Sequence, residues 1–124
     1  MIKSLGLGTD IIRISRIEKI LKSDKRQRFL NKIFSKEEIS LSKKKRCEFE
    51  FFAGRFAAKE AIRKAMSSKN FSRIKGFKSI NIPSQNNGKP FVDIKNFKKN
   101  IIISISHDGN YATAVCVVFK NGLF

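Results

Sequence analysis

The sequence has little of what several functional classes require. Its two cysteines, Cys47 and Cys116, lack the spacing of a C-x-x-C or metal motif, and nothing marks either thiol as a nucleophile. No stretch approaches the roughly 20 apolar residues of a membrane span, and the N-terminus has no signal-peptide core. We therefore expect a cytoplasmic protein with reduced thiols and no membrane contact.

Acidic residues are also scarce. Ten Asp and Glu stand against 27 Lys and Arg, which gives a net charge of +17. Such a charge predicts a polyanionic partner: nucleic acid, an anionic membrane, a phosphate-rich ligand or an acidic protein. Solubility combined with a compositional bias is the plainer explanation. No repeat or Pro- or Gly-rich linker interrupts the 124 residues, so we expect a single domain over residues 1–124.

The order of hydrophobic patterns predicts an α+β fold, with a mostly antiparallel sheet packed on a long central helix and short N-terminal helices. Ser35-Lys36-Glu37-Glu38 is a capping box, and Asn87-Gly88 supplies the positive φ of a tight turn. We expect a strand over 3–12, helices over about 15–22, 25–31, 35–44 and 48–67, and strand pairs 78–82 with 91–94 and 101–106 with 111–119.

One carboxylate, that of Glu60, falls in an apolar stripe of the long predicted helix. At about 100° per residue, it shares one side with Phe49, Ala53 and Phe56. A buried carboxylate is usually paired or bound to a metal. The pattern alone leaves both options open: a metal ligand, or a buried ion pair with Lys59, Arg63 or Lys64.

A second carboxylate, Asp10, ends a strand face that is otherwise bare. Strand alternation places Gly6, Gly8 and Asp10 on that face, and paired glycines indicate that a backbone or a ligand comes close. Asp10 is thus a candidate ligand for a compact cation, unless it caps the following helix. Two hard oxygen ligands suit Mg²⁺, and Lys59 and Lys64, expected at the helix surface, would suit a bound diphosphate.

The only histidine, His107, continues the phase of Ile101, Ile103 and Ile105 and precedes a turn. A lone histidine in such a place is more often structural than functional. Ser106 lies on the opposite face, where it could bond to a ligand or to the backbone.

Three segments together resemble the holo-[acyl-carrier-protein] synthase family of phosphopantetheinyl transferases. They are Gly6-Leu7-Gly8-Thr9-Asp10, the run from Phe52 to Ala61 that reads FAGRFAAKEA, and Ser104-Ile105-Ser106-His107 followed by Tyr111-Ala112. The turn Asn87-Gly88-Lys89-Pro90 fits the family too. The resemblance implies transfer of 4′-phosphopantetheine from coenzyme A to a serine of acidic apo-acyl carrier protein, with release of adenosine 3′,5′-bisphosphate. It also implies a homotrimer.

The resemblance carries residue roles over to this chain. It implies Mg²⁺ on Asp10 and Glu60, and catalytic roles for Glu60 and Lys64. The coenzyme A-binding residues would be Lys59, Lys64, Asn87, Gly88, Pro90, Ser106 and His107, and the carrier-protein-binding residues Arg16, Arg28 and Phe29.

Two other readings remain open. A small basic nucleic-acid-binding module would explain the charge, but not Glu60 among phenylalanines or the bare face that ends at Asp10. An inactive homologue that only binds the carrier protein would not need the full set of charged residues. We therefore expect an enzyme and no nucleic-acid partner.

Overall fold

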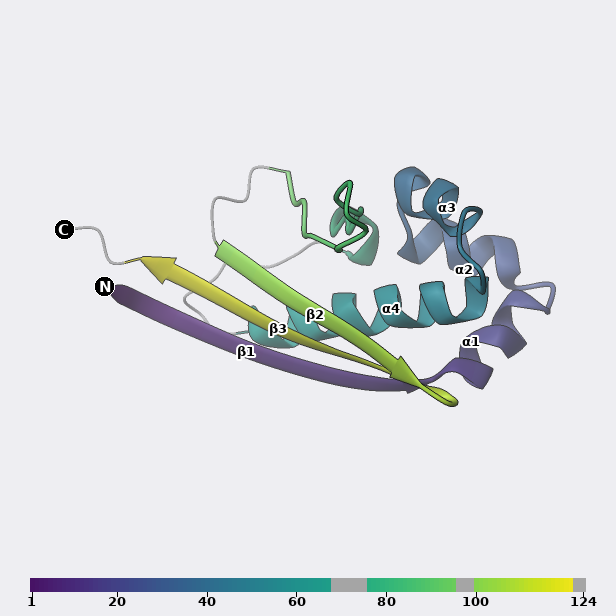
Figure 1. Cartoon of the computed structure of the whole chain (residues 1–124), viewed down its shortest axis with the longest axis horizontal. Helices are drawn as coiled ribbons and strands as arrows, with labels where there is room; N and C mark the ends of the chain where they lie inside the picture. The colour runs from purple at the N-terminus through teal and green to yellow at the C-terminus, as the bar shows by residue number, and fades with distance from the viewer. Residues whose placement is uncertain (68–75, 96–99, 122–124) are drawn as a thin grey trace.

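The computed structural model describes residues 1–67, 76–95 and 100–121. A long helix, α4 (Glu48–Ala65), packs on an antiparallel sheet whose strand order is β1-β3-β2 (Figure 1). The strands are β1 (Ile2–Arg13), β2 (Asn100–Asp108) and β3 (Tyr111–Asn121). Short helices α1 (Ile14–Leu21), α2 (Arg26–Ile33) and α3 (Lys36–Ser42) gather at the end of α4 where β1 ends. The predicted α+β class is confirmed.

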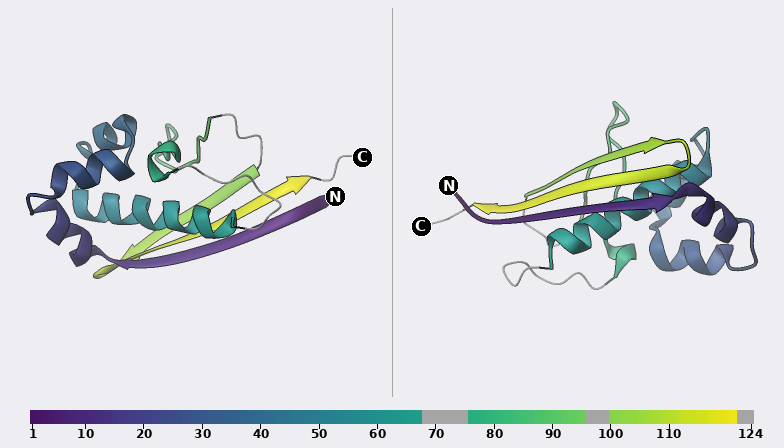
Figure 2. Two further views of the ribbon diagram at one scale, coloured as in Figure 1. Left: turned by 180° about the vertical axis from the view of Figure 1, so that it is seen from behind. Right: turned by 90° about the horizontal axis from the view of Figure 1, so that it is seen from below.

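Strand β1 approaches α4 unusually closely at Gly8. A Cβ built on Gly8 would lie 1.9 Å from the carbonyl oxygen of Ala61 and 2.8 Å from the amide nitrogen of Ala65. The predicted close approach is therefore that of a backbone. The strand and the helix run in opposite directions (Figures 1 and 2), so β1 passes from Ala65 toward the N-terminal half of α4 as it continues to Asp10.

The core explains why α4 is apolar nearly all round. The helix contacts all three strands as well as α1 and α3, so most of its faces are covered. Phe34 and Phe52 are fully buried, with ring centroids 4.7 Å apart. Strand β3 contributes the inward row Ala112, Ala114, Cys116 and Val118. Both cysteines are free thiols, as predicted.

The N-termini of helices α3 and α1 are capped in different ways. The capping box of α3 is confirmed: the Ser35 hydroxyl accepts from the Glu38 amide, and the Glu38 carboxylate accepts from the Ser35 amide. Helix α1 instead takes its cap from the β2–β3 turn, where Asn110 Oδ1 accepts from the Ser15 amide at 2.9 Å. Asp10 is therefore not the cap of α1.

The predicted strand pair 78–82 with 91–94 is only partly correct. Residues Phe77–Ser79 form a 3₁₀ turn, and the two segments are joined by isolated bridges, Asn81 to Asp93 and Ser84 to Pro90. We call residues 80–94 the side hairpin. Its turn has Gly88 at φ 86°, as the Asn-Gly sequence predicted. The sheet among the described residues accordingly has three strands.

The sheet face opposite α4 carries large apolar side chains that no described helix covers. Leu5, Leu7 and Ile11 of β1 are 63%, 65% and 63% exposed. Ile102 of β2 and Val115 of β3 continue this face, which we call the outer sheet face. Within the described ranges, no helix combines the length and apolar character needed to cross a membrane.

Candidate functional site

One corner of the molecule joins Asp10 of β1 to Lys64 of α4. The Lys64 Nζ atom lies 3.1 Å from Asp10 Oδ1 and donates to the Thr9 carbonyl oxygen at 2.9 Å. The Asp10 side chain is 17% exposed, whereas that of Lys64 is 54% exposed. A hollow of about 310 Å³ opens beside them, with Thr9 and Thr113 also on its wall. The corner offers oxygen atoms and one mobile cation to a small ligand.

Glu60 lies one turn before Lys64 on α4. Residues four apart share a side of a helix, and β1 advances in this direction as it passes from Gly8 to Asp10. The Glu60 side chain is half-buried, not buried as its stripe predicted. Among the described residues it has no salt-bridge or hydrogen-bond partner, so the alternative of an ion pair with Lys59, Arg63 or Lys64 is not found.

The buried charge on this stretch of α4 is that of Lys59. The prediction of Lys59 at the helix surface is wrong, because its side chain is 0% exposed and pairs with Glu38, also 0% exposed, at 2.7 Å. The Lys59 ammonium also donates to the carbonyl oxygens of Ile33 and Phe77. Burial lowers the pKa of Lys59, and the Glu38 charge opposes that shift. All three donors are used inside the protein, which leaves none for a coenzyme.

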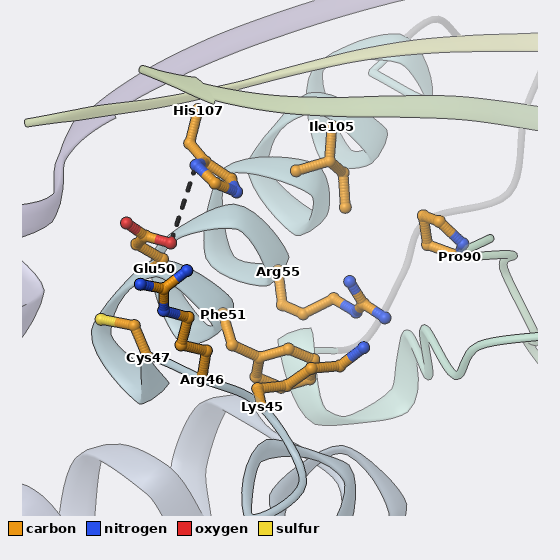
Figure 3. Close-up of a pocket in the computed structure, with 9 residues that line it drawn as sticks. All are labelled: Lys45, Arg46, Cys47, Glu50, Phe51, Arg55, Pro90, Ile105 and His107. Carbon is orange, nitrogen blue, oxygen red and sulfur yellow. Dashed lines mark ion pairs between the residues drawn. The ribbon is translucent and has the colours of Figure 1, made fainter. Parts of the chain in front are cut away.

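A second hollow, of about 320 Å³, lies between the N-terminal half of α4, β2 and the side hairpin. Figure 3 shows His107 of β2 beside Glu50 of α4, with His107 Nδ1 3.7 Å from Glu50 Oε2. Pro90 faces the hollow from the side hairpin, and the Arg55 side chain extends toward it (Figure 3). We call this hollow the basic pocket, since its remaining walls include Lys45 and Arg46.

Sequence reasoning missed the cations of the basic pocket. Arg55 is 7% exposed, and burial lowers the pKa of its guanidinium to about 10, against the opposing charge of Glu38. It therefore keeps its charge at neutral pH. Lys45 and Arg46 come from the basic run that directly precedes α4. That run, and the arginine inside the FAGRFAAKEA segment, were the signals available in the sequence.

The other predicted residues line neither the corner at Asp10 nor the basic pocket. Asn87 and Gly88 are exposed at the tip of the side hairpin, and Ser106 is exposed on β2. Arg16 of α1 lines a hollow of about 550 Å³ together with Arg13 and Lys19. Arg28 of α2 is exposed. Phe29 is half-buried, and its ring contacts Phe34 and Phe56, so part of it serves the core.

The residues of the corner at Asp10 and of the basic pocket lie in a segment shared with known enzymes. Residues 6–116 match the 4′-phosphopantetheinyl transferase superfamily. The chain belongs to this family. The holo-[acyl-carrier-protein] synthase of Thermodesulfovibrio yellowstonii is 44% identical over 113 residues, covering 91% of this chain and 96% of that relative. The resemblance inferred from the three sequence segments is thus confirmed, and so is the prediction of an enzyme of this family.

Solved structures of phosphopantetheinyl transferases share the fold. A holo-(acyl-carrier-protein) synthase from Bacillus anthracis, in complex with CoA (3′,5′-ADP), has a TM-score of 0.77 and 33% identity, with 94% of this chain and 96% of that chain covered. The Helicobacter pylori enzyme, in complex with coenzyme A, has a TM-score of 0.75 and 35% identity, with 90% and 98% covered.

Proposed function

We propose that this protein transfers 4′-phosphopantetheine from coenzyme A to a serine of apo-acyl carrier protein and releases adenosine 3′,5′-bisphosphate. The observation that carries the proposal is the pairing of a carboxylate corner with a basic pocket in a chain of this family. The serine oxygen forms a bond to the β-phosphorus of the coenzyme. The bond from that phosphorus to the bridging oxygen breaks, and the leaving nucleotide keeps the electron pair.

The corner at Asp10 suits Mg²⁺. Its acceptor groups are the Asp10 carboxylate and the hydroxyl groups of Thr9 and Thr113, all of them oxygens. This fits Mg²⁺, which commonly takes one or two carboxylates and fills its shell with water and phosphate oxygens. Asp10 and Glu60 would hold the ion, which when bound would neutralise charge on the diphosphate.

The chain's own groups then have separate tasks. Lys64 is exposed and flexible enough to exchange its contact with Asp10 for a phosphate oxygen. Glu60 has no partner among the described residues, so its carboxylate is available to the ion and, directly or through a water, to the serine proton. The reaction depends mostly on such positioning and charge neutralisation.

The basic pocket would hold the nucleotide end of coenzyme A. Its cations, Lys45, Arg46 and Arg55, suit a phosphate group, and His107 and Pro90 offer a flat ring and an apolar surface. Asn87, Gly88 and Ser106 do not line this pocket, and their contact with the coenzyme stays a prediction. We do not retain Lys59 as a ligand, because its ammonium is fully used by Glu38 and two carbonyl oxygens.

The remaining charge suits an acidic carrier protein. Arg13, Arg16 and Lys19 border one hollow where β1 passes into α1, and Arg28 and Phe29 follow on α2. A positive surface of this kind speeds the encounter with an acidic partner. We also propose that the protein is a homotrimer, since the outer sheet face exposes several large apolar side chains that contact with other copies would cover. The cytoplasmic location and the absence of a nucleic-acid partner stay predictions.

The direct test is a transfer assay. Purified protein with Mg²⁺ and coenzyme A should convert apo-acyl carrier protein to the holo form, seen as the mass gain of one phosphopantetheine. Glu60→Gln should abolish transfer without changing the circular dichroism spectrum, because it removes one negative charge from a half-buried group with no salt-bridge or hydrogen-bond partner among the described residues. An inactive wild-type protein beside a working transferase would overturn the proposal. A fully active Glu60→Gln variant would show that Glu60 is structural.

A further inference from the structure

The side hairpin is attached to the protein through side chains. None of the described residues 80–94 shares a backbone hydrogen bond with the three-stranded sheet. Both backbone groups of Ile82 are instead held by charged side chains. The Ile82 amide donates to Glu38 Oε2 at 2.8 Å, and Arg55 Nε donates to the Ile82 carbonyl oxygen at 2.9 Å. Arg55 also donates to the Ser84 hydroxyl at 2.9 Å.

The contact at Ile82 is tied to the Glu38–Lys59 pair. Glu38 Oε1 accepts from both Lys59 Nζ and the Ser35 amide at 2.7 Å, while its other oxygen holds Ile82. Lys59 reaches Phe77, just before the side hairpin, at 3.0 Å. One carboxylate thus connects α3, α4 and the side hairpin, and no buried polar side-chain atom of the described residues lacks a partner.

Such a pair is not explained by stability alone. A buried ion pair is often no more stable than an apolar pair of the same shape, because both charges are removed from water. Charged hydrogen bonds are directional, however, whereas the apolar packing of Ile80 and Ile82 defines a position less sharply. The segment held in this way is the one that brings Pro90 to the basic pocket.

We propose that Glu38 and Lys59 are positioning residues that hold the side hairpin against α4, and thereby keep Pro90 at the wall of the coenzyme pocket. This inference rests on the proposed transfer function. Neither side chain touches the pocket, so each acts through the side hairpin. Weakening the attachment should therefore impair the binding of coenzyme A. The rate of the chemical step and the binding of the carrier protein should be affected less.

The primary variant is Glu38→Asp. It keeps a negative charge beside Lys59, but its shorter side chain cannot span both Lys59 and the Ile82 amide. We expect the KM for coenzyme A to rise about tenfold, with kcat and the KM for the carrier protein changed less than about threefold. Hydrogen exchange of the peptide that contains Ile82 should become faster, whereas a purely structural role would lower the melting temperature and leave the KM unchanged.

A second variant covers the case in which Glu38→Asp does not fold. Asn81 accepts from the Ser35 hydroxyl at 2.6 Å and donates to Glu37 at 3.0 Å, outside both the buried pair and the pocket. Asn81→Ala loosens the same attachment, and should raise the KM for coenzyme A about threefold.

The matched control is Glu48→Gln. It removes the charge and one of the two acceptor oxygens that Arg26 uses on α4 without touching the side hairpin, and should leave the KM for coenzyme A unchanged. Wild-type KM values for coenzyme A in every folded variant would overturn this inference while the transfer function stands. A wild-type protein without transfer activity would overturn both.

Discussion

The contact between β1 and α4 predicts that Gly8→Ala is severely destabilising. The new Cβ would lie 1.9 Å from the Ala61 carbonyl oxygen, whereas ordinary van der Waals contact begins at 3.4 Å, so the strand would have to retreat by about 1.5 Å. Both the strand and the helix are hydrogen-bonded elements, so neither can yield locally. Overpacking usually costs 1–3 kcal/mol, and this case should reach about 4 kcal/mol. That is a large part of a typical 5–15 kcal/mol unfolding free energy.

The same substitution at two other glycines should destabilise the protein less. A Cβ on Gly54 would meet only the Cγ2 methyl of Ile105, at 2.9 Å, so the clash in Gly54→Ala should cost about 1–2 kcal/mol. The higher helix propensity of Ala in α4 offsets up to about 1 kcal/mol of that cost. A Cβ on Gly76 would meet nothing within 4 Å, and Gly76→Ala should change stability by less than about 0.5 kcal/mol.

Urea unfolding followed by circular dichroism at 222 nm measures all three variants, at one fixed protein concentration because assembly would shift the midpoint. The order Gly8, Gly54, Gly76 is the expected result. A loss of less than about 1 kcal/mol for Gly8→Ala would refute the reasoning, since it would mean that β1 can move away from α4 freely.

Three further predictions follow from the surfaces and the core. Leu7→Glu should place a charge on the outer sheet face and convert the proposed trimer to monomers in sedimentation velocity runs, and an unchanged sedimentation coefficient would contradict that interface. Carrier-protein binding should weaken steeply between low and high salt, and a salt-independent affinity would contradict electrostatic steering. Burial raises the pKa of the Cys116 thiol to about 12 from 9.0, so Ellman's reagent should modify Cys47 first and Cys116 only after unfolding. Because the folded state holds that proton more tightly, Cys116 stabilises the fold below about pH 9. This contribution should fall by up to about 1.4 kcal/mol per pH unit toward pH 12, and Cys116→Ala should remove that slope in urea titrations.

The parts of the fold that the sequence predicted are those governed by local patterns. Alternation along β1 correctly gave an inward face with Gly8 and Asp10 and an outward face with Leu7. The Ser35 capping box depends on four consecutive residues, and it was found at its predicted place. The 78–82 strand failed because the side hairpin is held by Glu38 and Arg55, which lie far away in the sequence and leave no local pattern.

In the candidate site too, local patterns could not predict an arrangement that distant contacts decide. This concerns two adjacent residues of α4. Lys59 and Glu60 are neighbours, so their side chains point about 100° apart, and one can be buried while the other stays partly exposed to solvent. A helix with a clear polar face would have shown which of the two lies inward. Helix α4 is apolar nearly all round, so its pattern fits either rotation.

The rotation of α4 is chosen by residues outside it. Glu38, on α3, offers the Lys59 ammonium a charge in the core, and Gly8 brings β1 against Ala61 and Ala65 on another side. With these two contacts satisfied, Glu60 has to lie between the core and the surface, one turn before Lys64 and on the side toward Asp10. A half-buried carboxylate without a partner among the described residues suits a metal ligand better than a buried, paired one does, because it can bind the ion without first breaking an ion pair with them.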